Sequence, residues 1–124
     1  MLNAGVWPFT FNITEGNEES ITTNVVSTAV LGFLLHPILS ATAKKYGVNS
    51  HITIVSSRLS GEAKFKESLV KEGRIFETLN DKKRADMGDR YQVTKLLESS
   101  IIRKIAELSS FESSRVIATV NAPG

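Results

Sequence analysis

The chain has 124 residues, of which 41% are hydrophobic and 23% charged, so it has the composition of a folded protein and room for one domain at most. Its formal net charge is only +2, and its basic residues are dispersed, which argues against nucleic acid and anionic membranes as partners. The 124 residues include no cysteine, which excludes a disulfide framework and thiolate metal sites within them. We therefore expect one globular domain, and a cytoplasmic location is compatible with this composition.

The N-terminal part of the chain predicts the end of a strand and then a long helix. Residues Met1–Val6 look like the last part of a strand, and a polar, turn-rich passage follows. From Glu18 to Tyr46, apolar residues recur at three- and four-residue spacing, which is typical of a helix. Pro37 would bend this helix or mark a joint in it, and Gly47 is the expected C-cap. The apolar stretch Thr28–Leu39 is shorter than the roughly 20 residues that span a bilayer, so no membrane span is expected.

The second half of the chain alternates strand and helix patterns. Two β-branched runs, His51–Ser56 and Arg115–Val120, predict buried strands, and Asp89–Leu108 predicts an amphipathic helix between them. Short helical pieces are expected around Phe65–Val70 and Ile75–Asn80. Because a strand–helix–strand connection within one sheet is almost always right-handed and parallel, we expect the two strands to be parallel neighbours with the long helix as their crossover.

Chemistry is most strongly indicated by a serine at a strand end and by a tyrosine and a lysine four residues apart. Tyr91 and Lys95 would share one face of the predicted helix, about one turn apart, and Ser57 ends the strand before it. An ammonium beside a phenol favours the phenolate, which makes a tyrosine a usable proton donor and acceptor near neutral pH. A serine hydroxyl nearby can hold a carbonyl or an alcohol. Ser56 is an alternative to Ser57, and a tyrosine–lysine pair on a solvated face is commoner than a catalytic one.

Three further motifs accompany these residues in a fixed order. Leu2-Asn3-Ala4-Gly5 stands at the start, Asn24 lies in the long helix, and Val120-Asn121-Ala122-Pro123-Gly124 follows the last strand. In this order and at these intervals the chain resembles the short-chain dehydrogenase/reductase family, and most of all its fungal, retinol-dehydrogenase-like branch. The resemblance spans essentially all of residues 1–124. It implies a single partial domain with a Rossmann-like, doubly wound parallel sheet.

The resemblance also implies roles for particular residues. Those matching the catalytic tetrad are Asn24, Ser57, Tyr91 and Lys95, with Tyr91 as proton donor and acceptor. Those matching cofactor-binding positions are Asn3, Ala4, Gly5, Tyr91, Lys95, Pro123 and Gly124. The implied cofactor is NADP or NAD, and the implied substrate is a small carbonyl or alcohol, in fungal relatives often one of secondary metabolism. No metal site is expected, because His36 and His51 fit core or surface positions, and packing is the favoured role of Trp7 and Phe9 over lining a pocket.

The glycine-rich turn of the family, Gly-x-x-x-Gly-x-Gly, does not occur in these residues, since no two glycines are closer than eleven positions. We therefore expect a slice that lacks the first strands and the pyrophosphate-binding loop. Three interpretations stay open: an oxidoreductase given in part, a catalytically silent interaction or pseudoenzyme module, and a slice whose partner supplies the cofactor half. The long helices, Glu18–Tyr46 and Asp89–Leu108, pack in dimers of the family, so a homodimer is possible. The substrate and the choice between NAD and NADP are not readable.

Overall fold

The computed structural model describes residues 1–71, 73–108 and 110–123. A short parallel sheet carries the fold: β3 (Ser50–Val55) pairs with β4 (Val116–Asn121), in a register that runs from Ser50 opposite Val116 to Val55 opposite Asn121. On the other edge of β3, Leu2 forms a parallel bridge to Ile54. The predicted pairing of the two strands and the strand-like start of the chain are both confirmed.

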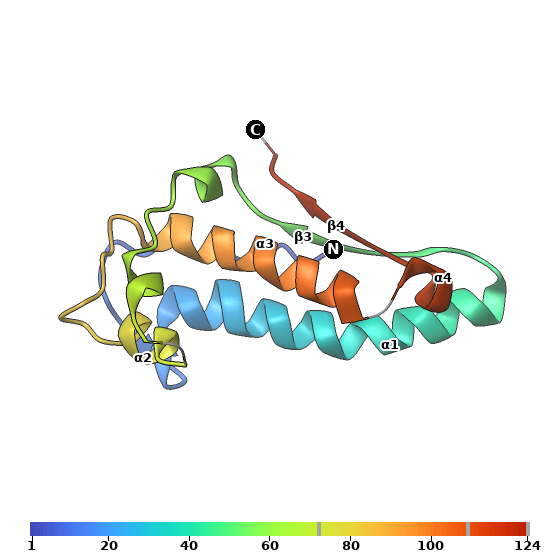
Figure 1. Ribbon diagram of the computed structural model, residues 1–124, viewed down its shortest axis with the longest axis horizontal. Coiled ribbons are helices and arrows are strands. Elements are labelled where there is room, and N and C mark those ends of the chain that lie inside the picture. Colours follow the sequence, from blue (N-terminus) through green and yellow to red (C-terminus); the bar gives the residue numbers. More distant parts are fainter. Residues whose placement is uncertain (72, 109, 124) are drawn as a thin grey trace.

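Two long helices cover one face of this sheet (Figure 1). The first begins as a π-helical segment, η1 (Ile21–Ser27), and continues as α1 (Thr28–Tyr46). The second is α3 (Arg90–Leu108), which leads through the short α4 (Phe111–Ser114) into β4 and so forms the predicted crossover. This mixed arrangement is a partial Rossmann-like α/β fold with a parallel sheet.

Alternation along the strands explains which face the helices cover. Ile52, Ile54 and Val116 are buried and form a core with Ile102 and Ile105 of α3. Thr53 and Thr119, one residue out of phase, are bonded to each other on the other face, with their Oγ atoms 2.9 Å apart.

Gly32 lets α1 approach α3 closely. A Cβ atom at Gly32 would lie 2.6 Å from Cδ1 of Ile105, so any side chain there would push the two helices apart. The helix also continues through Pro37 without interruption, which corrects the expectation of a joint at that residue. Gly47 ends it in the left-handed region with φ 67°, as expected of a C-cap.

The continuous helix Ile21–Tyr46 is, by length and composition alone, long and apolar enough to cross a membrane. This differs from the prediction, which counted only the shorter apolar stretch inside it. Its residues Asn24, Thr28 and Gly32 are nonetheless buried within the fold. A helix with one face built into a core satisfies the same test, so the finding is weak support for a membrane span.

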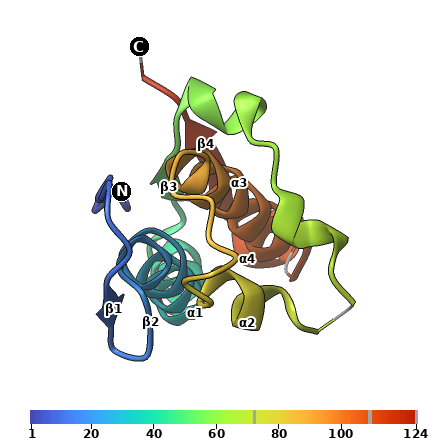
Figure 2. The ribbon, with the colours of Figure 1, turned by 90° about the vertical axis from the view of Figure 1, so that its left-hand side faces the viewer.

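Residues 58–88 pass around the end of α3 and reach the start of the first long helix (Figure 2). They contain three short helical elements: η2 (Arg58–Glu62), η3 (Lys66–Leu69) and α2 (Ile75–Leu79). The last two are the predicted short pieces. Near η1 the chain makes a small hairpin of β1 (Ile13–Thr14) and β2 (Asn17–Glu18).

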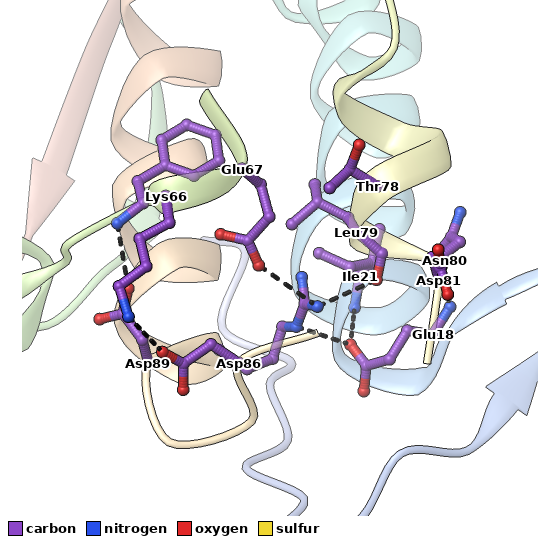
Figure 3. A network of polar contacts seen from close by, with 12 residues as sticks. Glu18, Ile21, Lys66, Glu67, Thr78, Leu79, Asn80, Asp81, Asp86 and Asp89 are labelled. Atoms are coloured by element: carbon purple, nitrogen blue, oxygen red, sulfur yellow. Dashed lines mark hydrogen bonds and ion pairs between the residues drawn. The ribbon is translucent and has the colours of Figure 1, made fainter. Parts of the chain in front are cut away.

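A buried arginine ties these segments together. Arg90 is 1% exposed, and its guanidinium lies 3.7 Å from the carboxylate of Glu18 and 3.6 Å from that of Glu67. It also donates a 2.9 Å hydrogen bond to the carbonyl oxygen of Leu79. Figure 3 shows Glu18, Glu67 and Leu79 converging from three different elements. Burial lowers the pKa of Arg90, and the two carboxylates oppose that effect by stabilising the charge.

Arg90→Met is expected to lower the free energy of unfolding by about 3 kcal/mol or more, because two buried carboxylates would lose their counter-ion. Urea denaturation followed by far-UV circular dichroism measures the change. Arg74→Met is the matched control, since the Arg74–Glu77 ion pair is exposed and should contribute within about 0.5 kcal/mol. Equal stability of the two variants would show that the buried network contributes nothing.

Candidate functional site

A cavity of about 300 Å³ lies at the carboxyl ends of the two parallel strands. In sheets of this type, ligands bind outside the carboxyl ends of the strands. The residues that line it come from the first loop, the end of β3, the start of α3 and the segment after β4: Asn3, Gly5, Val6, Trp7, Val55, Ser56, Ser57, Tyr91, Lys95 and Pro123. Segments far apart in the sequence therefore meet at one hollow.

Tyr91 and Lys95 both reach this cavity from the first turns of α3. The Lys95 ammonium lies 5.5 Å from the centre of the Tyr91 ring, within the range of a cation–π contact. The same ammonium donates to the carbonyl oxygen of Val55, at 3.0 Å, where β3 ends. The four-residue spacing thus brings the phenol and the ammonium together, as the sequence predicts.

The two adjacent serines differ in their hydrogen bonds. The buried Ser56 hydroxyl donates to the backbone oxygen of Lys95 at 2.9 Å. Ser57 is the N-cap of η2, and its hydroxyl oxygen accepts from the amide of Leu59 at 3.2 Å. Because that bond uses only an acceptor site, the Ser57 hydroxyl keeps its proton for donation toward the cavity. This difference favours Ser57 over Ser56 as the serine that holds a substrate.

Asn24 holds the first loop rather than lining the cavity. Its side-chain oxygen accepts from the amide of Val6 at 2.8 Å, and its nitrogen donates to the Val6 carbonyl at 2.9 Å and to the Thr94 hydroxyl at 3.0 Å. It is fully buried in η1, a π-helical segment of a kind found often at functional sites. Gly5 lies close by, since a Cβ there would be 3.4 Å from the Lys95 nitrogen.

The predicted cofactor-binding residues are only partly brought together. Asn3, Gly5 and Pro123 line the cavity with Tyr91 and Lys95. Ala4 instead lines a neighbouring hollow of about 210 Å³, between the first residues of the chain and the start of the long helix. Gly124 lies outside the described residues. Within the described ranges, no group of three or more His, Cys, Asp or Glu side chains is placed to hold a metal ion.

Two side chains at the site were missed by the interpretation of the sequence. Trp7 stacks on the Tyr91 ring, with ring centres 4.6 Å apart and planes 15° apart, so it lines the cavity instead of only packing. Glu98 places both carboxylate oxygens 3.1 Å from the Lys95 ammonium. The three-residue interval from Lys95 to Glu98 on a helix is a signal that could have found the second.

Burial determines the charge state of Glu98. The side chain is 1% exposed, and this desolvation raises its pKa from 4.5 to about 7, while the Lys95 ammonium pulls in the opposite direction. Glu98 therefore changes its charge near neutral pH, directly beside the lysine of the cavity.

Proteins of known class match this chain over most of its length. It is 38% identical over 121 residues to the short chain dehydrogenase/reductase dmxR8 of Cryptosporiopsis sp. (strain 8999), covering 96% of the chain and 37% of that protein. It is 35% identical over 126 residues to the short-chain dehydrogenase/reductase phmF of Phaeosphaeria nodorum, covering the whole chain and 36% of that protein. The short-chain dehydrogenase anuD of Penicillium roqueforti is 32% identical over 107 residues, which are 86% of the chain and 28% of that protein. No family model and no solved structure matches.

The fold and these matches define a partial Rossmann-like oxidoreductase segment. The chain belongs to the short-chain dehydrogenase/reductase family, and the relatives that it matches are fungal. It spans between 28% and 37% of the length of those three relatives.

Glu98→Gln should change how stability depends on pH. A glutamate whose pKa is raised to about 7 in the folded chain favours folding most below its ordinary value of 4.5, and this contribution is lost as pH rises through 7. The unfolding free energy of the unsubstituted chain minus that of Glu98→Gln should therefore fall between pH 4.5 and pH 9, by up to about 3 kcal/mol.

Urea denaturation at a series of pH values measures this difference. The matched control is Glu107→Gln, because Glu107 pairs with Lys104 at the same spacing on the same helix but is exposed. Its difference from the unsubstituted chain is expected to stay constant with pH. A constant difference for Glu98→Gln as well would contradict the raised pKa.

Proposed function

We propose that this chain is the proton-transfer part of an NAD(P)-dependent oxidoreductase that interconverts a carbonyl compound and its alcohol. The observation that supports this most is the meeting of Tyr91, Lys95 and Ser57 in one cavity at the carboxyl ends of the strands. The named dehydrogenases among the relatives agree with it and lend no support to a catalytically silent interaction module. In this proposal residues 1–124 form one partial domain.

In the direction of reduction, Tyr91 would donate its hydroxyl proton to the carbonyl oxygen of the substrate. Lys95, held beside the ring, would stabilise the phenolate left behind. Ser57 would donate a hydrogen bond to the same carbonyl oxygen and so orient it. In the proposal Asn24 holds the first loop and Thr94 in place and, as the family resemblance implies, a water of the proton relay.

The residues present fit the nicotinamide end of NADP or NAD. The cavity is open beside Gly5 and carries the ammonium of Lys95, which can bond to the ribose. Asn3, Gly5, Lys95 and Pro123 would line it. When bound, the cofactor supplies a hydride to the carbonyl carbon. The 124 residues contain no glycine-rich turn for the pyrophosphate, so they hold at most one end of the dinucleotide.

We further propose a cytoplasmic protein that assembles as a homodimer through its long helices. Support for the dimer comes from an apolar stripe on α1, where Val30, Leu34 and Ile38 stand four residues apart and are 51%, 63% and 60% exposed. A role in secondary metabolism, expected from the family branch, is part of the same proposal.

The proposal predicts little or no turnover for the 124-residue chain alone, because a hydride and a proton must reach the same carbonyl and only the proton donor is firmly held. The activity test therefore uses a chimera in which this chain replaces the matching 121 residues of the Cryptosporiopsis relative. Oxidation of NADPH and NADH is followed over a panel of aldehydes and ketones. Tyr91→Phe should lower kcat of the chimera by about 100-fold or more.

Tyr46→Phe is the matched control, since Tyr46 is the other tyrosine of the chain and lies exposed at the end of α1. It should leave kcat within twofold. Undiminished turnover in the Tyr91→Phe chimera would contradict the proposed function.

A further inference from the structure

Three aromatic rings stand in a row beside the cavity. The Trp7 ring stacks on the Tyr91 ring at 4.6 Å and 15°, and the Phe9 ring lies 6.0 Å from Trp7 with planes 30° apart. Both separations fall within the range of attractive offset stacking. The loop that carries Trp7 is held by the two hydrogen bonds between Asn24 and the backbone of Val6.

These rings are not part of either hydrophobic core. Trp7 belongs to neither group of buried apolar side chains, and it is 48% exposed, while Phe9 is 82% exposed. A tryptophan that served packing alone would bury most of its area, which is among the largest of any residue. Half of this aromatic surface is instead open to a ligand in the cavity that Trp7 lines.

The cavity thus has two chemically different sides. Ser57, Tyr91 and Lys95 supply hydrogen-bond donors, and Trp7 supplies an aromatic face in direct contact with the Tyr91 ring. A ligand whose carbonyl oxygen reaches the Tyr91 hydroxyl therefore has its neighbouring atoms close to Trp7. A few polar groups that orient a ligand and an apolar wall that selects its shape are what small-molecule sites have in common.

We propose that Trp7 and Phe9 form a stacking wall that selects planar aromatic carbonyl substrates, such as aryl ketones and the corresponding alcohols, over saturated ones. A flat ring conjugated to the carbonyl can stack on the wall in the offset manner of the three side chains. A saturated ring is thicker and has no π-face, so it loses that contact. This inference rests on the proposed function, since it places the carbonyl at Tyr91.

Ligand binding, measured without turnover, tests the wall separately from the chemistry. Equilibrium dialysis of the 124-residue chain compares 2-acetylnaphthalene with its saturated counterpart 2-acetyldecalin. We expect the aromatic ketone to bind at least tenfold more tightly. Trp7→Leu, which keeps an apolar side chain and removes the ring, should reduce this preference at least fivefold, whereas Trp7→Phe should retain most of it.

Phe9→Leu provides a second variant at an exposed position, should Trp7→Leu fail to fold by circular dichroism. It should also weaken the preference, by about twofold or more. Equal binding of the two ketones, or a preference unchanged in both leucine variants, would overturn the inference. Nicotinamide is the third ligand: if it binds more tightly than the aromatic ketone and loses affinity in Trp7→Leu, the wall serves the cofactor and the inference is also overturned.

Tyr91→Phe separates the two proposals. This variant keeps the stacked ring and loses the acidic hydroxyl, so the tenfold preference for the aromatic ketone should persist while turnover of the chimera disappears. A preserved preference with undiminished turnover would remove the proposed function alone. A lost preference in Trp7→Phe and Tyr91→Phe alike would remove the stacking wall alone.

Discussion

The site depends on how Lys95 fastens α3 to the end of β3. Its ammonium donates to the carbonyl oxygen of Val55, and its own carbonyl oxygen accepts from the Ser56 hydroxyl. These two bonds hold the first turns of α3 at the point where β3 ends, so Tyr91, one turn earlier, lies at the carboxyl ends of the strands. A buried ammonium needs a counter-ion, and Glu98 supplies it with both oxygens at 3.1 Å.

That counter-ion has a consequence for chemistry near neutral pH. The Glu98 carboxyl is desolvated enough that its pKa rises to about 7, so the charge beside Lys95 is itself titratable in this range. An ionised Glu98 holds the ammonium to the helix, and a protonated one releases part of that hold. Lys95 thereby has two environments, and the one with neutral Glu98 leaves more of its donor capacity for other acceptors, such as a ribose.

Regular elements and their pairing followed from local sequence patterns, because the periods of 2 and 3.6 residues are imposed by the backbone and by burial alone. The Tyr91–Lys95 pair was found for the same reason. Arg90 was not, because a charged residue at a helix start is typical of a surface, and only the distant Glu18 and Glu67 make its burial possible. Trp7 was assigned to packing because its contact with Tyr91 joins residues 84 positions apart, by a loop path that no short-range pattern encodes.

Asn24 connects these features. It is fully buried, yet all of its described hydrogen bonds go to Val6 and Thr94, so its amide spaces the first loop from α3. Trp7 is the next residue after Val6, and Lys95 is the next after Thr94. One side chain therefore sets the distance between the aromatic face and the ammonium on opposite sides of Tyr91's neighbourhood in sequence. This explains how a polar residue inside an apolar helix can be required by the site without lining its cavity: it fixes the two segments between which the cavity is formed.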